Sequence, residues 1–123
     1  MNNRKIAIID KDIKSIGKLK EILSLCGYTP VPVIDSLLAV NTIIQSDLDL
    51  ILMDLRIPQY RGFEITYTIN RACETKKVPI IAMSDVYKDE FRGLLDFRGI
   101  KRWIKKPFHP LNLIWAIENA IVA

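Results

Sequence analysis

Residues 48–54 have the sequence LDLILMD, in which the apolar run Leu48–Met53 leads directly into Asp54. Strands that are covered on both faces of a parallel sheet have near-continuous apolar runs of this kind, whereas half-exposed strands alternate. Four further short runs, rich in β-branched residues or leucine, have the same character: Lys5–Ile9, Thr29–Val33, Val78–Met83 and Arg102–Ile104. The sequence therefore predicts five buried parallel strands.

Amphipathic helical patterns separate and follow these runs. In the first, apolar residues recur at helical spacing from Ile16 to Cys26, and Gly27 provides the stop signal. The others are a helix opened by Asp35 or Ser36, one over Phe63–Cys73, one over Lys88–Phe97 closed by Gly99, and one that begins at Pro110 and runs to the chain end. Five strand–helix units with right-handed crossovers predict a doubly wound α/β fold.

The order of the strands follows from two prolines in the second run. Pro30 and Pro32 donate no ladder hydrogen bonds, so this run belongs at an edge of the sheet. The flavodoxin-like order 2-1-3-4-5 places the second strand at an edge. We therefore expect a flavodoxin-like (βα)5 domain over residues 1–123, a length suited to one domain.

Composition limits the classes of function. The formal net charge is +4, but 14 acidic residues are interspersed with the basic ones and no basic run of five occurs, so direct binding to nucleic acid is not favoured. No apolar run approaches the roughly 18 residues of a membrane span. The amino-terminal run stops at Asp10, too early for a secretory signal, and a cytoplasmic location is expected. Cys26 and Cys73 are expected to be reduced and packed as small apolar side chains.

Polar residues with complementary chemistry follow four of the predicted strands. They are Asp10 after the first, Asp54 after the third, Ser84 after the fourth and Lys106 after the fifth. In open α/β sheets, sites form at the carboxyl ends of the strands near the point where the strand order reverses, here between strands one and three. Two carboxylates, a hydroxyl and an ammonium in this order predict one polar pocket at that edge.

The sequence resembles the receiver domain of bacterial two-component response regulators over nearly its whole length. The matching stretches are IAIIDKD (6–12), LCGY (25–28), DLILMDLRIP (49–58), VPIIAMS (78–84) and WIKKPF (103–108). The resemblance implies that Asp54 accepts a phosphoryl group from a histidine kinase or phosphotransfer protein, and that the domain is a signalling module rather than an enzyme. It further implies Mg²⁺ held by Asp10, Asp54 and the backbone carbonyl of Arg56, with Ser84 and Lys106 contacting the phosphoryl group and a cis Lys106–Pro107 peptide.

Two positions depart from the family pattern. Lys11 stands where the family usually has a second metal-binding acid, which lowers the expected affinity for Mg²⁺. Its ammonium either takes the cation's place beside Asp54 or extends into solvent on its long stem. Asp85 stands where the family prefers a small residue, and it either narrows the phosphoryl pocket or caps the following helix.

Lys11 therefore leaves two hypotheses for function. One is a phosphoryl-accepting switch, and the alternative is a pseudo-receiver, a phosphorylation-independent protein-interaction module in which Lys11 replaces the cation. A flavodoxin-like cofactor binder is disfavoured because residues 11–14, KDIK, form no Gly- or Ser/Thr-rich phosphate loop.

The resemblance also implies an output face made of the fourth helix, the fifth strand and the fifth helix. Trp103 is at the position of the family's switch aromatic, and it is either that or a packing aromatic. Trp115 falls on the polar side of the last helix, which predicts an exposed interface anchor with Lys88, Arg92 and Arg102 as a basic rim. We expect a homodimer or an acidic partner there.

Overall fold

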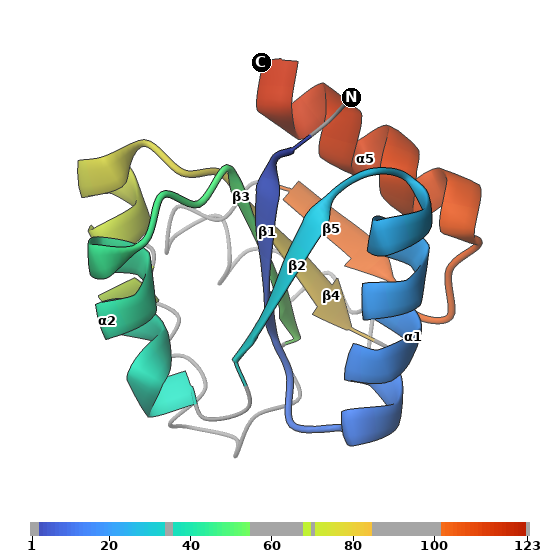
Figure 1. Cartoon of the computed structure of the whole chain (residues 1–123), viewed down its shortest axis with the longest axis horizontal. Helices are drawn as coiled ribbons and strands as arrows, with labels where there is room; N and C mark the ends of the chain where they lie inside the picture. The colour runs from blue at the N-terminus through green and yellow to red at the C-terminus, as the bar shows by residue number, and fades with distance from the viewer. Residues whose placement is uncertain (1–2, 34–35, 55–67, 70, 85–101, 123) are drawn as a thin grey trace.

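The computed structural model describes residues 3–33, 36–54, 68, 69, 71–84 and 102–122. The chain forms an α/β sandwich with one central parallel sheet (Figure 1). The strands are β1 (Lys5–Ile9), β2 (Thr29–Val33), β3 (Leu50–Asp54), β4 (Ile80–Ser84) and β5 (Arg102–Lys105). The helices with defined bounds are α1 (Ile13–Leu25), α2 (Ser36–Gln45) and α5 (Pro110–Val122), and residues 71–76 are also helical.

The five strands are parallel in the order β2-β1-β3-β4-β5, which confirms the predicted topology. Strand β2, with Pro30 and Pro32, lies at an edge beside β1. Each proline lacks an N–H donor, and at an edge of the sheet this removes the fewest hydrogen bonds between strands. The order reverses between β1 and β3, and their carboxyl ends are therefore neighbours.

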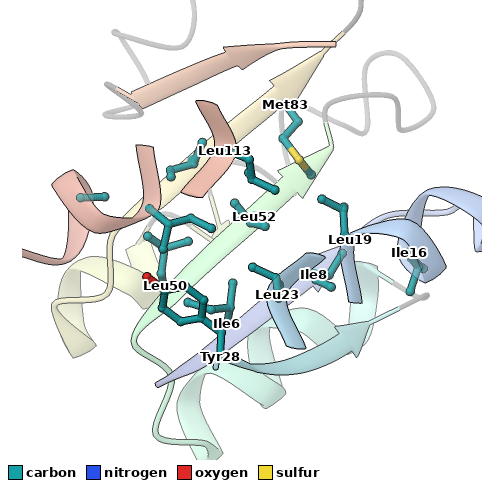
Figure 2. Close-up of a cluster of buried hydrophobic side chains, with 13 residues drawn as sticks. Ile6, Ile8, Ile16, Leu19, Leu23, Tyr28, Leu50, Leu52, Met83 and Leu113 are labelled. Carbon is teal, nitrogen blue, oxygen red and sulfur yellow. The ribbon is translucent and has the colours of Figure 1, made fainter. Parts of the chain in front are cut away.

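Both faces of the sheet are covered over the central strands β1, β3 and β4, as their near-continuous apolar runs predict (Figure 1). The edge strands β2 and β5 are mostly half-buried or exposed, so the prediction of burial was wrong for them. Successive residues of a strand point to opposite faces. Ile6, Ile8, Leu50 and Leu52 pack toward α1 and α5, in the cluster that Figure 2 shows. The alternate residues, Ala7, Ile9, Ile51 and Met53, pack in a second cluster with Ile43 of α2 and with Ile69 and Cys73.

Strands β3 and β4 begin two residues later than predicted, at Leu50 and Ile80. Leu48 and Val78 are buried apolar residues, but they lie in the segments that lead into the strands. The backbone N–H of Val78 donates to the carbonyl of Cys73, a partner outside the sheet. Apolar residues indicate where the chain becomes buried, and here the chain is buried before its backbone begins to pair with the neighbouring strand.

Both ends of α1 are capped, the amino end by Asp12 and the carboxyl end at Gly27, the predicted stop. The side chain of Asp12 accepts a hydrogen bond from the N–H of Lys14 at the amino end (3.0 Å). At the carboxyl end, the N–H of Tyr28 donates to Leu23 and that of Gly27 to Ser24, while Gly27 has a φ of 86°. This Schellman motif needs a left-handed residue, which glycine provides without a Cβ penalty.

The two cysteines differ in burial, which corrects the expectation that both are packed in the core. Both are free thiols and Cys73 is buried, but Cys26 is exposed at the end of α1. Helical spacing placed Cys26 on the apolar stripe, whereas the helix ends one residue before it. Burial, together with the charge of Glu74, raises the pKa of the Cys73 thiol to about 12.

In the described part of the chain, no helix is both long and apolar enough for a membrane crossing.

Candidate functional site

Two aspartates lie side by side at the carboxyl edge of the sheet. Asp54 is the last residue of β3, and Asp10 directly follows β1, where its N–H still donates to the carbonyl of Val33 in β2 (3.4 Å). Both are buried, with total exposures of 5% and 4%. Buried carboxylates require compensation by positive charge or hydrogen-bond donors. The surroundings of this acid pair provide both.

Lys106 is the cation that joins the two carboxylates. Its Nζ lies 2.9 Å from Oδ2 of Asp54 and 3.3 Å from Oδ2 of Asp10. These three residues are far apart in the sequence, and the β1–β3–β4–β5 order brings them together. Among the described residues, one ammonium against two carboxylates leaves a formal charge of −1. The acid pair therefore retains an attraction for a further cation.

Ser15, in the first turn of α1, completes this cluster. The Nζ of Lys106 donates to Oγ of Ser15 (3.3 Å), and the Ser15 side chain also hydrogen-bonds Asp10. The sequence analysis missed this residue. A signal was present, because Ser15 lies one helical turn before the buried Leu19 and so faces the sheet side of α1.

The pKa of Asp10 reflects these neighbours. Burial raises it, but hydrogen bonds and charge outweigh that effect, so the pKa lies below the ordinary value of 3.8. The stabilising contributions come from the backbone N–H of Asp12, which donates to Oδ1 of Asp10 (2.9 Å), from the charge of Lys106 and from Ser15. Asp10 is therefore ionised at neutral pH and available to bind a cation.

The end of β4 holds Lys106 in place. The backbone N–H of Lys106 donates to the carbonyl of Ser84 (2.7 Å), and the Lys106–Pro107 peptide is cis. Ser84 is the last residue of β4 and is buried. It thus lies at the same edge as Asp54, whose strand pairs with β4.

Lys11 does not take part in this cluster. Its side chain is exposed, and the cation in contact with Asp54 is Lys106. Of the two positions considered for the Lys11 ammonium, the structure shows the one in solvent. Lys106 already supplies an ammonium to both carboxylates, and the long stem of Lys11 extends into solvent.

The donor set of the acid pair fits Mg²⁺, with few protein ligands. Mg²⁺ takes one or two carboxylates and keeps several waters. Asp10 and Asp54 supply two carboxylates within reach of one cation, as their shared contact with Lys106 shows. Within the described residues, no cluster of three or more His, Cys, Asp or Glu side chains occurs. The substitution at Lys11 explains the missing third acid.

Of the residues expected on the output face, three lie in the described part of the chain. Trp103 of β5 is half-buried and packs against the apolar cluster on the α2 side of the sheet. Arg102 is half-buried, and Trp115 of α5 is 69% exposed. Lys88 and Arg92 lie outside the described residues, as do Asp85 and Arg56, which the resemblance implied for the phosphoryl and metal site.

Comparison with known proteins identifies the family. The family model of the response regulator receiver domain matches residues 6–118. The chain belongs to this family, whose members act in two-component signalling. The fold, the family and its class of signalling module agree with the resemblance seen in the sequence.

Curated relatives cover the same region. Response regulator GtcR of Aneurinibacillus migulanus is 30% identical over 116 residues, which cover 94% of this chain and 47% of that protein. The phosphate regulon transcriptional regulatory protein PhoB of Escherichia coli (strain K12) is 27% identical over 117 residues, covering 94% and 50%. This chain thus spans about half the length of the curated relatives it matches.

Solved structures have the same fold. The receiver domain of sensor histidine kinase PA1611 from Pseudomonas aeruginosa PAO1 superposes with a TM-score of 0.86 at 25% identity, covering 98% of this chain and 99% of that one. That structure has a magnesium ion coordinated in its active-site cleft. Chemotaxis protein CheY4 of Vibrio cholerae gives the same TM-score at 22% identity, covering 96% and 98%.

Proposed function

We propose that this receiver domain accepts a phosphoryl group on Asp54 from a histidine kinase or phosphotransfer protein. The observation that supports this most is the contact of one lysine with two buried aspartates at the switch point of the sheet. In the proposed step, an oxygen of Asp54 attacks the phosphorus of a phosphohistidine. The new O–P bond forms as the P–N bond breaks, and the histidine keeps the electron pair of that bond.

The residues around Asp54 supply what phosphoryl transfer requires, which is mainly positioning and neutralisation of charge. The ammonium of Lys106, now 2.9 Å from Asp54, is close enough to pair with an oxygen of the transferred group. Ser84, at the end of the adjacent strand, would donate its hydroxyl to another oxygen. Asp54 and Asp10 would hold Mg²⁺, which supplies further neutralisation of the phosphoryl oxygens when it is bound.

The test uses a small phosphodonor and intact mass. Incubated with acetyl phosphate and millimolar Mg²⁺, the protein should gain one phosphoryl group, and Asp54→Asn should gain none. Because Lys11 replaces a metal-binding acid, Lys11→Asp should reach the same extent of modification at a lower Mg²⁺ concentration. No mass gain for the wild-type protein or for Lys11→Asp at any Mg²⁺ concentration would contradict the proposal.

A specific observation favours a second candidate, a phosphorylation-independent interaction module. Lys106 contacts both carboxylates, and Lys11 stands where the family usually has another acid, so less negative charge remains for a metal to compensate. In this version the cation beside Asp54 is Lys106 rather than Lys11. A partner that binds wild-type protein and Asp54→Asn equally, with or without acetyl phosphate, would support this candidate over the switch.

We propose that output passes through α5 and β5 to a second copy of the chain or to an acidic partner. Trp115 and Leu111 are exposed on successive turns of α5, at 69% and 72%, and Arg102 lies on β5. An exposed aromatic with an exposed apolar side chain one helical turn away is a common interface anchor.

In this proposal the domain acts in the cytoplasm, where kinases that use nucleotides act. It is a signalling domain and does not catalyse a reaction of a separate substrate. Among the relatives, PhoB is named as a transcriptional regulator, and about half of its length lies beyond the match. We therefore assign no direct nucleic-acid contact to this domain.

A further inference from the structure

A groove adjoins the acid pair on the side of α1. It is lined by Ser15, Lys18, Leu19 and Ile22 of α1 and by Lys106, Pro107 and Phe108, which follow β5. Its volume is about 350 Å³, at the lower end of the range found for small-molecule sites. The groove and the acid pair share Lys106, whose side chain is 18% exposed. A ligand in the groove therefore reaches the ammonium that holds Asp54.

The lining has polar residues and an apolar wall. The polar lining residues are Lys18, Lys106 and Ser15, and no lining residue is acidic. Leu19 is buried beneath the groove, while Ile22 and Phe108 are half-buried along it. The carboxylates of Asp10 and Asp54 contact Lys106 and offset its charge. Lys18 is a second lysine of the lining, and its ammonium favours an anionic head, while the apolar lining residues favour an organic group.

From this arrangement we propose that the groove binds a small organic anion, a phosphate monoester or carboxylate that carries an aryl or short alkyl group. The anionic head lies against Lys18, Lys106 and Ser15, and the apolar group lies on Ile22 and Phe108. The bound head competes with Asp54 for Lys106, so occupancy of the groove and the state of the acid pair are thermodynamically coupled. This site does not require that Asp54 be phosphorylated.

Phenyl phosphate is a suitable probe, because it combines both chemical features. Titration followed by backbone amide NMR should shift the signals of Ser15, Lys18 and Phe108. Inorganic phosphate and benzyl alcohol, each with half of the chemistry, should bind at least several-fold more weakly. Equal affinity for phenyl phosphate and inorganic phosphate would overturn the proposal, because the apolar wall would then contribute nothing.

Variants locate the binding. Lys18→Ala should weaken phenyl phosphate binding roughly three- to fivefold, the size expected for one partly exposed charge contact. Lys20→Ala, an exposed lysine of the same helix that does not line the groove, should leave it unchanged. Equal effects of the two variants, or no shift in the wild-type protein, would overturn the site. If the wild-type protein shows no shift, side chains of a partner protein are the alternative occupant of the groove.

A third variant tests the coupling. Asp54→Asn removes one competitor for Lys106, so phenyl phosphate should bind it more tightly than it binds the wild-type protein. Unchanged affinity would refute the coupling while leaving the groove site intact. None of these measurements depends on phosphorylation, so a failure here is distinguishable from a failure of acetyl phosphate to modify Asp54.

Discussion

Lys106 holds two buried carboxylates with one charge, so the ion pairs of the site depend on this shared contact. The distances to Asp54 and Asp10, 2.9 and 3.3 Å, are those of direct ion pairs. Without Lys106, the two aspartates would be buried like charges with less compensation. Removal of Lys106 therefore costs more than the loss of an ordinary surface ion pair.

A double-mutant cycle measures this coupling. Lys106→Met keeps the aliphatic stem and removes the charge, and it should destabilise the metal-free protein because Asp54 and Asp10 then repel each other. Asp54→Asn should reverse part of that loss, giving a coupling energy of about 1–3 kcal/mol in urea unfolding at neutral pH. Lys105→Met, an exposed neighbour, is the control. Additive effects of Lys106→Met and Asp54→Asn would contradict the interpretation.

The lowered pKa of Asp10 makes a prediction about acid. Because the folded-state pKa lies below 3.8, the unfolded chain takes up the proton first as the pH falls. The stability that Asp10 contributes is complete well above pH 3.8 and is lost as the pH falls through its folded pKa. In metal-free buffer, Asp10→Asn should therefore flatten the decline of the urea midpoint between about pH 5 and pH 3.

Asp47→Asn is the matched control for this experiment, because Asp47 is exposed. Its pH profile should follow that of the wild-type protein. If Asp10→Asn also followed the wild-type profile, the hydrogen bonds from Asp12 and Ser15 would not stabilise the charged form of Asp10.

At the scale of elements, helix α1 connects the site to the core. Its amino end follows Asp10, its first turn contributes Ser15, and its buried residues Ile16, Leu19 and Leu23 pack on the sheet (Figure 2). Asp12 fixes where the helix begins and Gly27 where it ends. The position of Ser15 against Lys106 therefore depends on the caps of α1.

The two glycines of this region should respond in opposite directions to alanine. Gly27 has a φ of 86°, so Gly27→Ala should cost about 1–2 kcal/mol, the price of a left-handed L-residue. Gly17 lies inside α1, and a Cβ there meets nothing within 4 Å, so Gly17→Ala should stabilise by about 0.5–1 kcal/mol. Thermal or urea unfolding gives both values. Two changes of the same sign would contradict the assigned backbone conformations.

At the scale of the whole molecule, the sheet separates two apolar clusters, and among the described residues the large aromatic side chain of Trp115 lies outside both. Leu113, Ile117 and Ala120 of α5 are buried against the sheet, while Trp115 faces away from it. The exposed side of α5 also includes Leu111 and Val122. Exposed apolar side chains on the otherwise polar side of one helix support the proposed interface.

Trp115→Ala tests that interface. Since the side chain is mostly exposed, the free energy of unfolding should change by less than about 0.5 kcal/mol. Self-association in sedimentation experiments, or affinity for the output partner, should fall at least several-fold. Ile44→Ala, which removes an exposed apolar side chain from α2, should change neither. Unaltered assembly and partner affinity in Trp115→Ala would remove α5 as the interface.

Much of the fold was predictable because local and global signals agree. The prolines of β2 indicated the edge, the apolar runs of β1, β3 and β4 indicated strands buried on both faces, and Gly27 indicated the end of α1. The exact start of β3 was not predictable, because apolar character indicates burial but not which residues pair in the sheet. The exposure of Cys26 was not predictable either, because apolar spacing does not show where the last helical turn ends. Family resemblance identified Asp10, Asp54 and Lys106 but not Ser15, whose role depends on a contact between distant elements.

The sequence by itself determined the order of elements, the two faces of each strand and the chemical types available at the strand ends, because these follow from periodicity and composition along the chain. Only the tertiary structure decided which cation neutralises the acid pair. Lys11 is next to Asp10 in sequence, yet Lys106, nearly a hundred residues away, makes the contact. The reason is geometric: parallel strands bring their carboxyl ends to one edge, and there distance in space replaces distance along the chain.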